Sequence, residues 1–587
     1  MDDGRALTTL PPRFAAWFAG RGWAARPHQL AMVEKARAGR HALLIAPTGG
    51  GKTLAGFLPS LIELSERPPS NAPRGIHTLY LSPLKALAVD IERNLMAPIG
   101  EMGLAIKAES RTGDTGVSRR QRQRVKPPDM LLTTPEQLAL FCAWEGARRY
   151  FEDLRCVIVD EVHATWPSKR GDLLALGLAR LQQFAPNLRR VGLSATVDDP
   201  DVIRRWLTPT TQDDVDLVRG LPGAPPVVDV LLSEGQVPWA GHTARHAMPE
   251  VYEAIKRARI ALVFVNTRFQ AEFAFQELWR LNEDNLPIAL HHGSLSAEQR
   301  RKVEAAMARG ALRAVVCTST LDLGIDWGDV DLVIQLASPK GASRMVQRIG
   351  RANHRLDEAS RALFVPANRF EMLECQAARE AIAENALDAE PEREGALDVL
   401  AQHVMGLACS EPFDLLTLYD EVREAGPYRD LAWEDFEAVI DFVSTGGYAL
   451  KTYDRFKRIV KGLDGLWKVR NEETALRHRM NVGAIVSPAM LSVRVVGRRR
   501  GTVGRKIGEV EEGYLEVLEP GDTFLFGGQV WELVGVAGLD VLVRPAGDKT
   551  PKMPSWGGSK FALSTFLAKK VRHLMSESAH WDVLPDD

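Results

Sequence analysis

Residues 46–53 (APTGGGKT) combine the residue types that bind nucleoside phosphates. They follow an apolar run, HALLIA, and precede a stretch with a helical pattern. Glycines let backbone N–H groups point at a phosphate, and the start of a helix adds partial positive charge. We expect this P-loop to bind ATP, with Lys52 at the β- and γ-phosphates and the Thr53 hydroxyl on Mg²⁺. The rest of the predicted cradle is Thr48, Gly49, Gly50 and Gly51.

A second group with catalytic chemistry is Asp160-Glu161-Val162-His163, which ends the apolar run RCVIVD. An acidic residue at the carboxyl end of a parallel strand lies beside such a phosphate loop, where Mg²⁺ needs an anionic oxygen. We predict that Asp160 holds the metal and that Glu161 orients and deprotonates the attacking water. His163 is predicted to link the nucleotide site to a second binding site.

Two blocks of short apolar runs separated by helical stretches must position these residues. The first block covers residues 42–195, and the second covers residues 261–365 and contains no P-loop. Short, fully apolar strands alternating with helices indicate parallel sheets covered on both faces. We therefore predict two tandem doubly wound α/β domains, joined near residues 207–226, which are rich in Pro, Gly and Asp.

The composition changes after the second block. Residues 397–409, 412–424 and 433–444 predict three short helices, followed by Gly446-Gly447 and a β-like turn. Three helices and a wing are typical of a winged-helix domain, with a small helical bundle as the alternative. Beyond about residue 460 the chain is rich in Gly and Val and predicts a β-rich domain.

These patterns predict four consecutive domains, over residues 1–215, 216–390, 391–458 and 459–587. The chain reaches Asp587 soon after a helical stretch, without an obvious closing element. We therefore expect either a truncated chain or a natural protein that continues beyond this residue.

The overall composition limits the class of protein. Among 587 residues, 45% are hydrophobic and 26% are charged, and the net charge is −2. Five scattered cysteines form no CxxC pair, which favours a reduced cytoplasmic protein in which the cysteines are core residues. We expect no membrane span and no signal peptide. A nucleic-acid partner would need local basic patches, and residues 497–508 are a weak candidate because a solvated hairpin explains them equally well.

Three segments together resemble motifs I, II and III of the DEXH-box helicases of superfamily 2: APTGGGKT, DEVH and Ser194-Ala195-Thr196. The resemblance implies that Ser194 and Thr196, with His163, couple the nucleotide and nucleic-acid sites. Residues 80–87, 111–115 and 133–138 resemble the motifs of this family that grip a nucleic-acid strand. It also implies an adenine-reading role for Arg26 and Gln29, and strand contacts for Ser82, Pro83, Lys85, Arg111 and Thr134.

The second block carries the complementary motifs of the same resemblance. Residues 318–326 resemble motif V, with Gly324 and Asp326 near the ribose, and residues 347–355 resemble motif VI. Motif VI implies catalytic positions for Gln347, Arg351 and Arg355, because a guanidinium can stabilise charge on the transferring phosphoryl group. Arg351 matches the first arginine finger, whereas either His354 or Arg355 occupies the second position. The implied strand contacts in this block are Asn266, Thr267, Arg268, His292 and Thr318.

The likeness extends to the Lhr group of helicases, on WFAGRGWAARPHQ, YLSPLKALAVD, RTGDT and QRIGRANHR. Residues 10–23 and 28–64 most resemble the bacterial ligase-associated branch of that group. This likeness implies 3′→5′ translocation on single-stranded DNA, with ATP and Mg²⁺, and unwinding of 3′-tailed DNA or DNA–RNA duplexes in DNA repair. A functional association with a DNA ligase and nucleases is implied as well. An RNA helicase and an ATPase that remodels protein–DNA complexes without separating strands remain as alternatives.

Trp556 lies in the segment PSWGG, where flanking Pro and Gly disfavour a regular strand or helix. A similar Pro-x-Trp-x-Gly element occurs in the Lhr group and implies a contact with the tracking strand. We expect the indole to stack on a base. The alternative is that Trp556 caps the β-rich domain.

Overall fold

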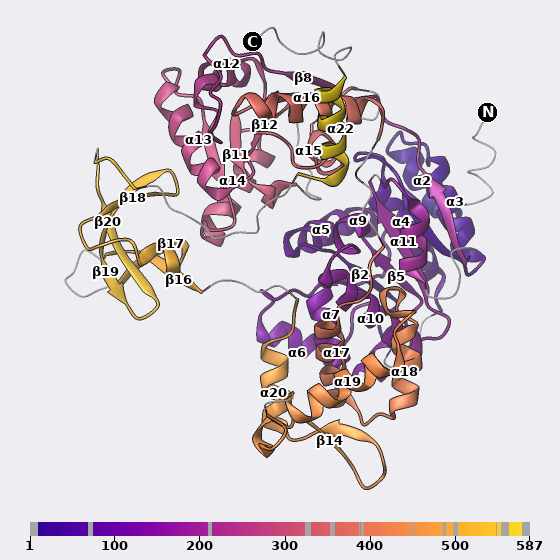
Figure 1. Ribbon diagram of the computed structural model, residues 1–587. Helices are drawn as coiled ribbons and strands as arrows, with labels where there is room; N and C mark the ends of the chain where they lie inside the picture. The colour runs from indigo at the N-terminus through magenta and orange to yellow at the C-terminus, as the bar shows by residue number, and fades with distance from the viewer. Residues whose placement is uncertain are drawn as a thin grey trace. The chain divides into compact units, whose positions relative to one another are not determined.

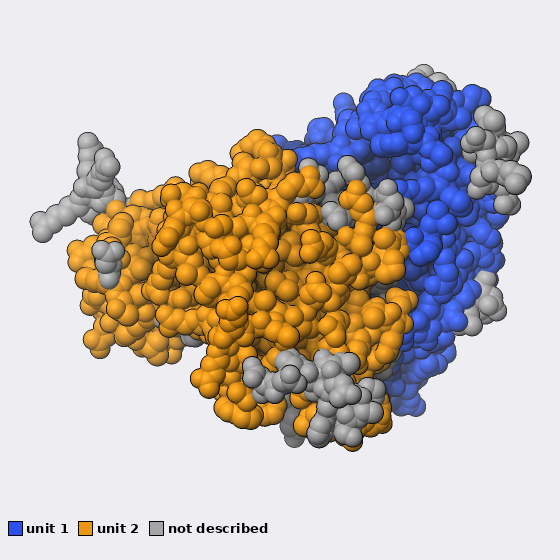
Figure 2. All heavy atoms as spheres, turned by 90° about the horizontal axis from the view of Figure 1, so that it is seen from above, with its two compact units in different colours: residues 1–222, 390–486 blue, residues 223–389, 487–587 orange. Residues whose placement is uncertain are grey.

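The computed structural model describes residues 10–68, 74–195, 197–208, 214–322, 330–352, 358–386, 388, 392–447, 450–484, 489–496, 503–547, 549–552 and 563–577 (Figure 1). The chain divides into two compact units (Figure 2). Unit 1 comprises residues 1–222 and 390–486, and unit 2 comprises residues 223–389 and 487–587. Each unit therefore joins one α/β lobe to a later part of the chain.

The first lobe, in unit 1, is built on a seven-stranded parallel sheet in the order β3-β4-β2-β5-β6-β1-β7. Leu43 and Leu44 are completely buried in two different hydrophobic clusters, because successive side chains of a strand point to opposite faces. The strands are β1 (His41–Ile45), β2 (Thr78–Leu81), β3 (Ala108–Ser110), β4 (Met130–Thr133), β5 (Cys156–Val159), β6 (Arg189–Ser194) and β7 (Val215–Arg219). The helices are α2 (Pro12–Gly20), α3 (Pro27–Arg37), α4 (Lys52–Glu66), α5 (Lys85–Glu101), α6 (Val117–Val125), α7 (Pro135–Cys142), α8 (Ala147–Phe151), α9 (Val162–Thr165), α10 (Lys169–Phe184) and α11 (Pro200–Leu207).

The second lobe, in unit 2, has a six-stranded parallel sheet in the order β10-β11-β9-β12-β13-β8. Its strands are β8 (Val227–Val230), β9 (Ala261–Phe264), β10 (Ile288–His291), β11 (Ala314–Cys317), β12 (Leu332–Leu336) and β13 (Arg361–Val365). Its helices are η2 (Arg245–Ala247), α12 (Met248–Arg257), α13 (Arg268–Leu281), α14 (Ala297–Ala308), η3 (Ser319–Leu321), α15 (Ala342–Ile349) and α16 (Arg369–Ala383). Two doubly wound lobes were predicted from the alternating apolar runs, and this fold class is confirmed.

The segment expected to be only a linker, residues 207–226, contains the strand β7, and β8 follows directly after it. β7 extends the first sheet beside β1, and β8 extends the second sheet beside β13. Both are short edge strands with polar residues among the apolar ones, so their apolar signal is weak. The division between the two compact units follows Pro222, whereas the predicted domain boundary follows Val215.

The three predicted helices of the winged-helix domain are present and pack on the first lobe. Val404 and Leu407 of α17 share a hydrophobic cluster with Phe141 of α7 and Leu178 of α10. Residues 459–480 lie in the same compact unit as these helices, beyond the predicted boundary at residue 458. The elements are α17 (Leu397–Ser410), α18 (Leu415–Arg423), η4 (Gly426–Tyr428), α19 (Trp433–Thr445), η6 (Asp454–Phe456), β14 (Ile459–Lys461), β15 (Trp467–Val469) and α20 (Glu472–Met480).

The β-rich domain is confirmed as a five-stranded sheet in the order β17-β16-β20-β19-β18, and it packs on the second lobe. Phe524 and Val541 belong to the same hydrophobic cluster as Leu278 and Val263 of that lobe. The elements are β16 (Met490–Val496), β17 (Val503–Glu511), α21 (Glu512–Leu515), β18 (Thr523–Phe526), β19 (Gln529–Ala537), β20 (Asp540–Pro545) and α22 (Thr565–Ser576).

Candidate nucleotide-binding and nucleic-acid-binding sites

The P-loop joins the carboxyl end of β1 to the start of α4. Gly49 and Gly51 have left-handed backbones, with φ of 76° and 72°, and Gly51 caps α4. A Cβ atom on Gly50 would lie 2.7 Å from the Pro47 carbonyl oxygen, so a larger residue there would distort the turn. The loop therefore has the tight glycine turn that phosphate binding requires, with Thr48, Lys52 and Thr53 on it.

Residues at the start of α3 hold the P-loop carbonyls. An Arg26 guanidinium nitrogen donates to the Gly49 carbonyl at 3.0 Å, and His28 Nε2 lies 2.8 Å from the Gly50 oxygen. The Gln29 amide donates to the Gly51 carbonyl at 3.4 Å and accepts from the Arg26 N–H at 2.9 Å. Both ends of the Gln29 amide thus bind protein here, and its adenine contact stays a prediction. The role of His28 was not predicted from the sequence, because only the folded loop brings this side chain to Gly50.

Two buried carboxylates lie beside the P-loop lysine. Asp160 accepts hydrogen bonds from the Tyr80 hydroxyl and, at 2.8 Å, from the Glu161 N–H. Lys52 Nζ lies 4.0 Å from a Glu161 carboxylate oxygen. Burial, together with the charge of Glu161, raises the pKa of Asp160 to about 6, against the opposing effect of Lys52. A divalent cation would relieve this repulsion, so the Asp160 carboxylate and the Thr53 hydroxyl fit the oxygen ligands that Mg²⁺ prefers.

Glu161 has an unusual backbone conformation for a residue with a side chain. Its φ of 46° and ψ of 45° are left-handed, and the residue is only 5% exposed. Such a conformation costs of order 1–3 kcal/mol and persists where the surrounding structure imposes it. It places the carboxylate within 3.3 Å of His163 Nε2, while His163 Nδ1 lies 2.8 Å from the Ser194 hydroxyl. A continuous chain of polar contacts thus connects Glu161 to Ser194, and Thr196 lies outside the described residues.

The predicted strand contacts of the first lobe gather at one edge of its sheet. Their positions follow β2, β3 and β4, which are neighbours, so the carboxyl ends of these strands meet. Lys85 is exposed and lies 3.1 Å from Asp114, whereas Arg111 and Thr134 are nearly buried. Ser82 has no exposed surface, and its hydroxyl bonds to the Leu84 carbonyl at 3.2 Å. The strand contact of Ser82 therefore stays a prediction. Pro83 accepts a hydrogen bond from Arg170 through its carbonyl.

The second lobe repeats this arrangement at the carboxyl ends of β9, β10 and β11, which are also neighbours. Thr267 is exposed and caps α13, and its hydroxyl accepts from the Gln270 N–H at 3.1 Å. Asn266 donates to the Ser338 carbonyl at 3.0 Å, and Arg268 lies 3.8 Å from Glu511. Thr318 is 8% exposed and follows β11. Each lobe therefore presents polar side chains at the same end of its sheet.

His292 does not lie on this surface. The imidazole and the Glu272 carboxylate that it contacts at 3.0 Å are both completely buried. Glu272 also accepts from the N–H groups of Gly527 and Gly528, at 2.6 and 2.8 Å, and so joins the β-rich sheet to the lobe. The imidazole therefore presents no surface to a strand in this structure, and the strand contact of His292 stays a prediction.

The motif VI residues lie on and after α15. Gln347 is half-buried, and Arg351 is only 3% exposed at the end of the helix. Arg348 binds Asp322 at 2.8 Å and Gln335 at 2.5 Å, and its guanidinium lies 4.8 Å from the centre of the Phe264 ring. It is thus a structural ion pair inside the lobe. Gly324, Asp326, His354, Arg355 and Trp556 lie outside the described residues, so their predicted roles stay predictions.

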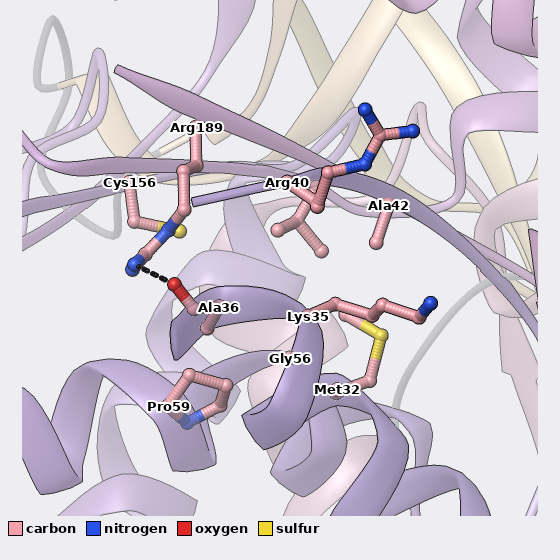
Figure 3. A pocket seen from close by; sticks show the side chains of 10 residues that line it. Met32, Lys35, Ala36, Arg40, Ala42, Gly56, Pro59, Cys156 and Arg189 are labelled. Atoms are coloured by element: carbon pink, nitrogen blue, oxygen red, sulfur yellow. Dashed lines mark hydrogen bonds between the residues drawn. The ribbon is translucent and has the colours of Figure 1, made fainter. Parts of the chain in front are cut away.

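A small cavity lies at the opposite end of the first sheet from the P-loop (Figure 3). Ala42, Cys156 and Arg189, at the starts of β1, β5 and β6, line it, and Arg189 donates to the Ala36 carbonyl at 2.8 Å. Its volume of about 10 Å³ is close to the minimum for one water molecule. The cavity is therefore a packing gap and not a ligand site. The five cysteines are buried and free, as the sequence indicated.

A P-loop beside a buried Asp–Glu pair in one α/β lobe, and a second α/β lobe carrying the motif VI arginine, define a superfamily 2 helicase, a class of nucleic-acid-dependent ATPases. Among the described residues, no helix has the length and apolarity needed to cross a bilayer.

The comparisons with known proteins give the family. The DEAD/DEAH box helicase model matches residues 26–204, the helicase conserved C-terminal domain matches residues 245–355, and the winged helix domain of large helicase-related protein matches residues 380–553. The chain is 34% identical to ATP-dependent helicase Lhr-Core protein 2 of Thermococcus barophilus, with 96% of this chain and 66% of that protein covered. It is 32% identical to ATP-dependent helicase Lhr-Core of Methanocaldococcus jannaschii, with 97% and 67% covered.

The chain belongs to the Lhr family of ATP-dependent helicases. It spans about two thirds of the length of these two archaeal relatives. Among solved structures, it resembles Mycobacterium smegmatis helicase Lhr bound to ssDNA and AMP-PNP, with a TM-score of 0.74 and 34% identity over 83% of this chain and 64% of that one.

Proposed function

We propose that this protein is an ATP-driven translocase that moves 3′→5′ on single-stranded DNA and unwinds DNA or DNA–RNA duplexes. The observation that carries the proposal is the repeated set of polar residues at the carboxyl ends of neighbouring strands in both lobes. The Mycobacterium smegmatis relative, in complex with ssDNA and AMP-PNP, supports the choice of a single strand.

We assign roles in the chemistry of the proposed ATP site to five residues. Lys52 neutralises charge on the β- and γ-phosphates, and Asp160 with Thr53 would hold Mg²⁺, which supplies a positive charge next to the phosphates. Glu161 accepts a proton from the attacking water, and Arg351 stabilises negative charge that develops on the transferring phosphoryl group. His163 and Ser194 couple Glu161 to the strand-binding side of the lobe. His163 lies 3.3 Å from the Glu161 carboxylate and 2.8 Å from the Ser194 hydroxyl.

The biological setting is also part of the proposal. The likeness of residues 10–23 and 28–64 to the bacterial ligase-associated branch supports a role in DNA repair, in the cytoplasm of a bacterium, alongside a DNA ligase and nucleases. Trp556 is proposed as a base-stacking contact with the tracking strand. An RNA helicase and a remodelling ATPase that separates no strands are the two other outcomes that experiments must distinguish.

Hydrolysis of ATP should depend on a single-stranded cofactor. Single-stranded DNA should stimulate steady-state ATP hydrolysis strongly. Its half-saturating concentration should rise with salt, because phosphate contacts release counterions. The logarithm of the binding constant should fall with the logarithm of the salt concentration, with a slope of about −0.7 per phosphate contact. The measurement is the hydrolysis rate as a function of oligonucleotide and salt concentrations, with buffer alone as the control. Equally fast hydrolysis without any nucleic acid would contradict the translocase proposal.

A further inference from the structure

We propose that the arginine cluster of Arg111, Arg124 and Arg479 binds phosphates of single-stranded nucleic acid at the C-terminal end of α7. The cluster extends the strand-binding surface of the first lobe onto the winged-helix domain within unit 1. This inference rests on the proposed function, because it needs a strand that already crosses the carboxyl ends of β2, β3 and β4.

Three arginines from three different parts of the chain converge on one helix end: Arg111 after β3, Arg124 on α6 and Arg479 on α20. The Arg111 guanidinium lies 4.3 Å from the centre of the Phe141 ring, in the last turn of α7. The Arg124 guanidinium, from α6, lies 5.1 Å from the centre of the Trp144 ring, two residues beyond the helix. Arg479, from α20, donates to the Ala143 carbonyl at 3.2 and 3.3 Å. Residues 141–144 are thus the common contact of the cluster.

These contacts hold the guanidinium groups in place without neutralising them. In the part of the chain that the structure describes, neither Arg124 nor Arg479 forms an ion pair with a carboxylate. Other arginines of α6 differ, because Arg119 binds Glu92 at 2.8 Å and Arg122 binds Glu109 at 2.6 Å. Aromatic faces and helix-end carbonyls leave the remaining N–H donors of Arg124 and Arg479 available, and a fixed guanidinium loses less entropy when it binds an anion.

The positive charges of the cluster also repel one another, as expected of an anion-binding site. Burial, together with the charge of Arg124, lowers the pKa of Arg111 to about 10. Burial, followed by the charges of Arg479 and Arg120, lowers the pKa of Arg124. The Nε atom of Arg111 has no hydrogen-bond partner, although the residue is only 4% exposed. A phosphate beside these groups would relieve their repulsion.

The position of the cluster fits the path of a strand. Helix α7 begins after Thr134, one of the predicted strand contacts, and its eight residues span about 12 Å at 1.5 Å per residue. The cluster lies at the far end of this helix, beyond Thr134. The net charge of the whole chain is −2, so a local group of cations must supply the attraction for the phosphate backbone. Arg and phosphate also form favourable bidentate hydrogen bonds.

The test compares Arg124→Gln with Arg122→Gln in the full chain. Both variants remove one positive charge from α6, but Arg122 is already paired with Glu109. Fluorescence anisotropy would measure binding of DNA oligonucleotides of about 6 and about 16 nucleotides, within the range of known single-strand site sizes. We expect Arg124→Gln to weaken binding of the longer strand roughly three- to fivefold, and Arg122→Gln to leave it unchanged.

The salt dependence gives a second readout that a structural defect would not produce. The slope of log K against log salt for the longer strand should become shallower by about 0.7 in Arg124→Gln, which is the loss of one phosphate contact. Arg124→Gln should weaken the binding of RNA of the same sequence to the same degree, because DNA and RNA share the phosphate backbone. Arg479→Gln should act in the same direction, although it also removes hydrogen bonds to the Ala143 and Cys409 carbonyls, so its melting temperature must be compared with the wild type.

Two results would overturn the inference. The first is an Arg124→Gln variant that binds the longer strand with wild-type affinity and wild-type salt slope. The second is a variant that loses affinity only for duplex DNA, which would make the cluster a duplex contact. Failure of the proposed function is distinguishable, because it would abolish strand-stimulated ATP hydrolysis in the wild type itself, whereas Arg124→Gln should retain hydrolysis stimulated by the short strand.

Discussion

A Lys52→Ala variant should lose ATP binding and hydrolysis, and a Glu161→Gln variant should bind ATP but fail to hydrolyse it. Lys52 is the cation of the P-loop, and its Nζ lies 4.0 Å from the Glu161 carboxylate. Loss of a general base lowers the rate by about 10²–10⁴-fold, whereas a glutamine side chain of the same shape leaves the phosphate cradle intact. Nucleotide binding by a fluorescent ATP analogue and steady-state hydrolysis with single-stranded DNA measure the two effects separately.

Lys35→Ala is the matched control for Lys52→Ala. Lys35 lies on α3 of the same lobe, where its amine binds Asp216 at 3.1 Å on the surface. This variant should bind and hydrolyse ATP like the wild type. If Glu161→Gln hydrolyses ATP at nearly the wild-type rate, Glu161 is not the base, and the strained backbone at this residue needs another explanation.

An Arg351→Ala variant should lower the kcat for ATP hydrolysis by roughly 10³-fold, the scale expected of a residue that stabilises the transition state of phosphoryl transfer. ATP affinity should change much less, because the guanidinium is proposed to act on charge that develops only during the reaction. The kcat, the KM for ATP and the Kd of a non-hydrolysable analogue would be measured on the same preparations.

Neighbouring residues provide the controls for Arg351. Arg344→Ala removes an exposed arginine from α15, the helix that precedes Arg351, and should leave kcat unchanged. Arg348→Ala breaks a buried ion pair with Asp322 and should instead destabilise the second lobe, by about 3–5 kcal/mol. The variants His354→Ala and Arg355→Ala test which of these two residues occupies the second arginine-finger position. A severe defect in His354→Ala beside a mild one in Arg355→Ala would reverse the preference for arginine there.

The two α/β lobes could be predicted because their central strands are apolar on both faces. Runs such as residues 42–46 and 261–265 can be buried only between two layers of helices. The edge strands β7 and β8 could not be recognised in the same way, since an edge strand is half-exposed and their sequences, VDLVR and VVDV, mix polar with apolar residues. Their pairing with β1 and β13 depends on residues far away in the sequence.

The nucleotide site was the most predictable part of the functional surface. Its residues belong to short contiguous segments, so their spacing carries the chemistry. His28 was missed because its bond to Gly50 exists only after α3 packs beside the P-loop. The burial of His292 could not be foreseen either, because Ser294 and Leu295, just after it, pair with β17, more than two hundred residues further along the chain.

The sequence also could not predict which of the later domains packs on which lobe. The helices of the winged-helix domain and the strands of the β-rich domain have recognisable periods, but nothing local says that the former pack on the first lobe and the latter on the second. Specific side chains establish these partners. Arg180 of α10 binds the buried Glu421 of α18 at 2.8 Å, and Glu272 of α13 binds the backbone of Gly527 and Gly528.

Strand displacement is the most direct test of ATP-driven 3′→5′ movement along single-stranded DNA. Three duplexes of the same sequence would be compared, one with a 3′ tail, one with a 5′ tail and one blunt, with DNA–DNA, RNA–DNA and RNA–RNA versions of the tailed forms. We predict ATP-dependent displacement from the 3′-tailed DNA–DNA and DNA–RNA duplexes alone, and none with Lys52→Ala. Displacement that requires the 5′ tail, a preference for RNA–RNA duplexes, or strand-stimulated ATP hydrolysis without any displacement would contradict the account.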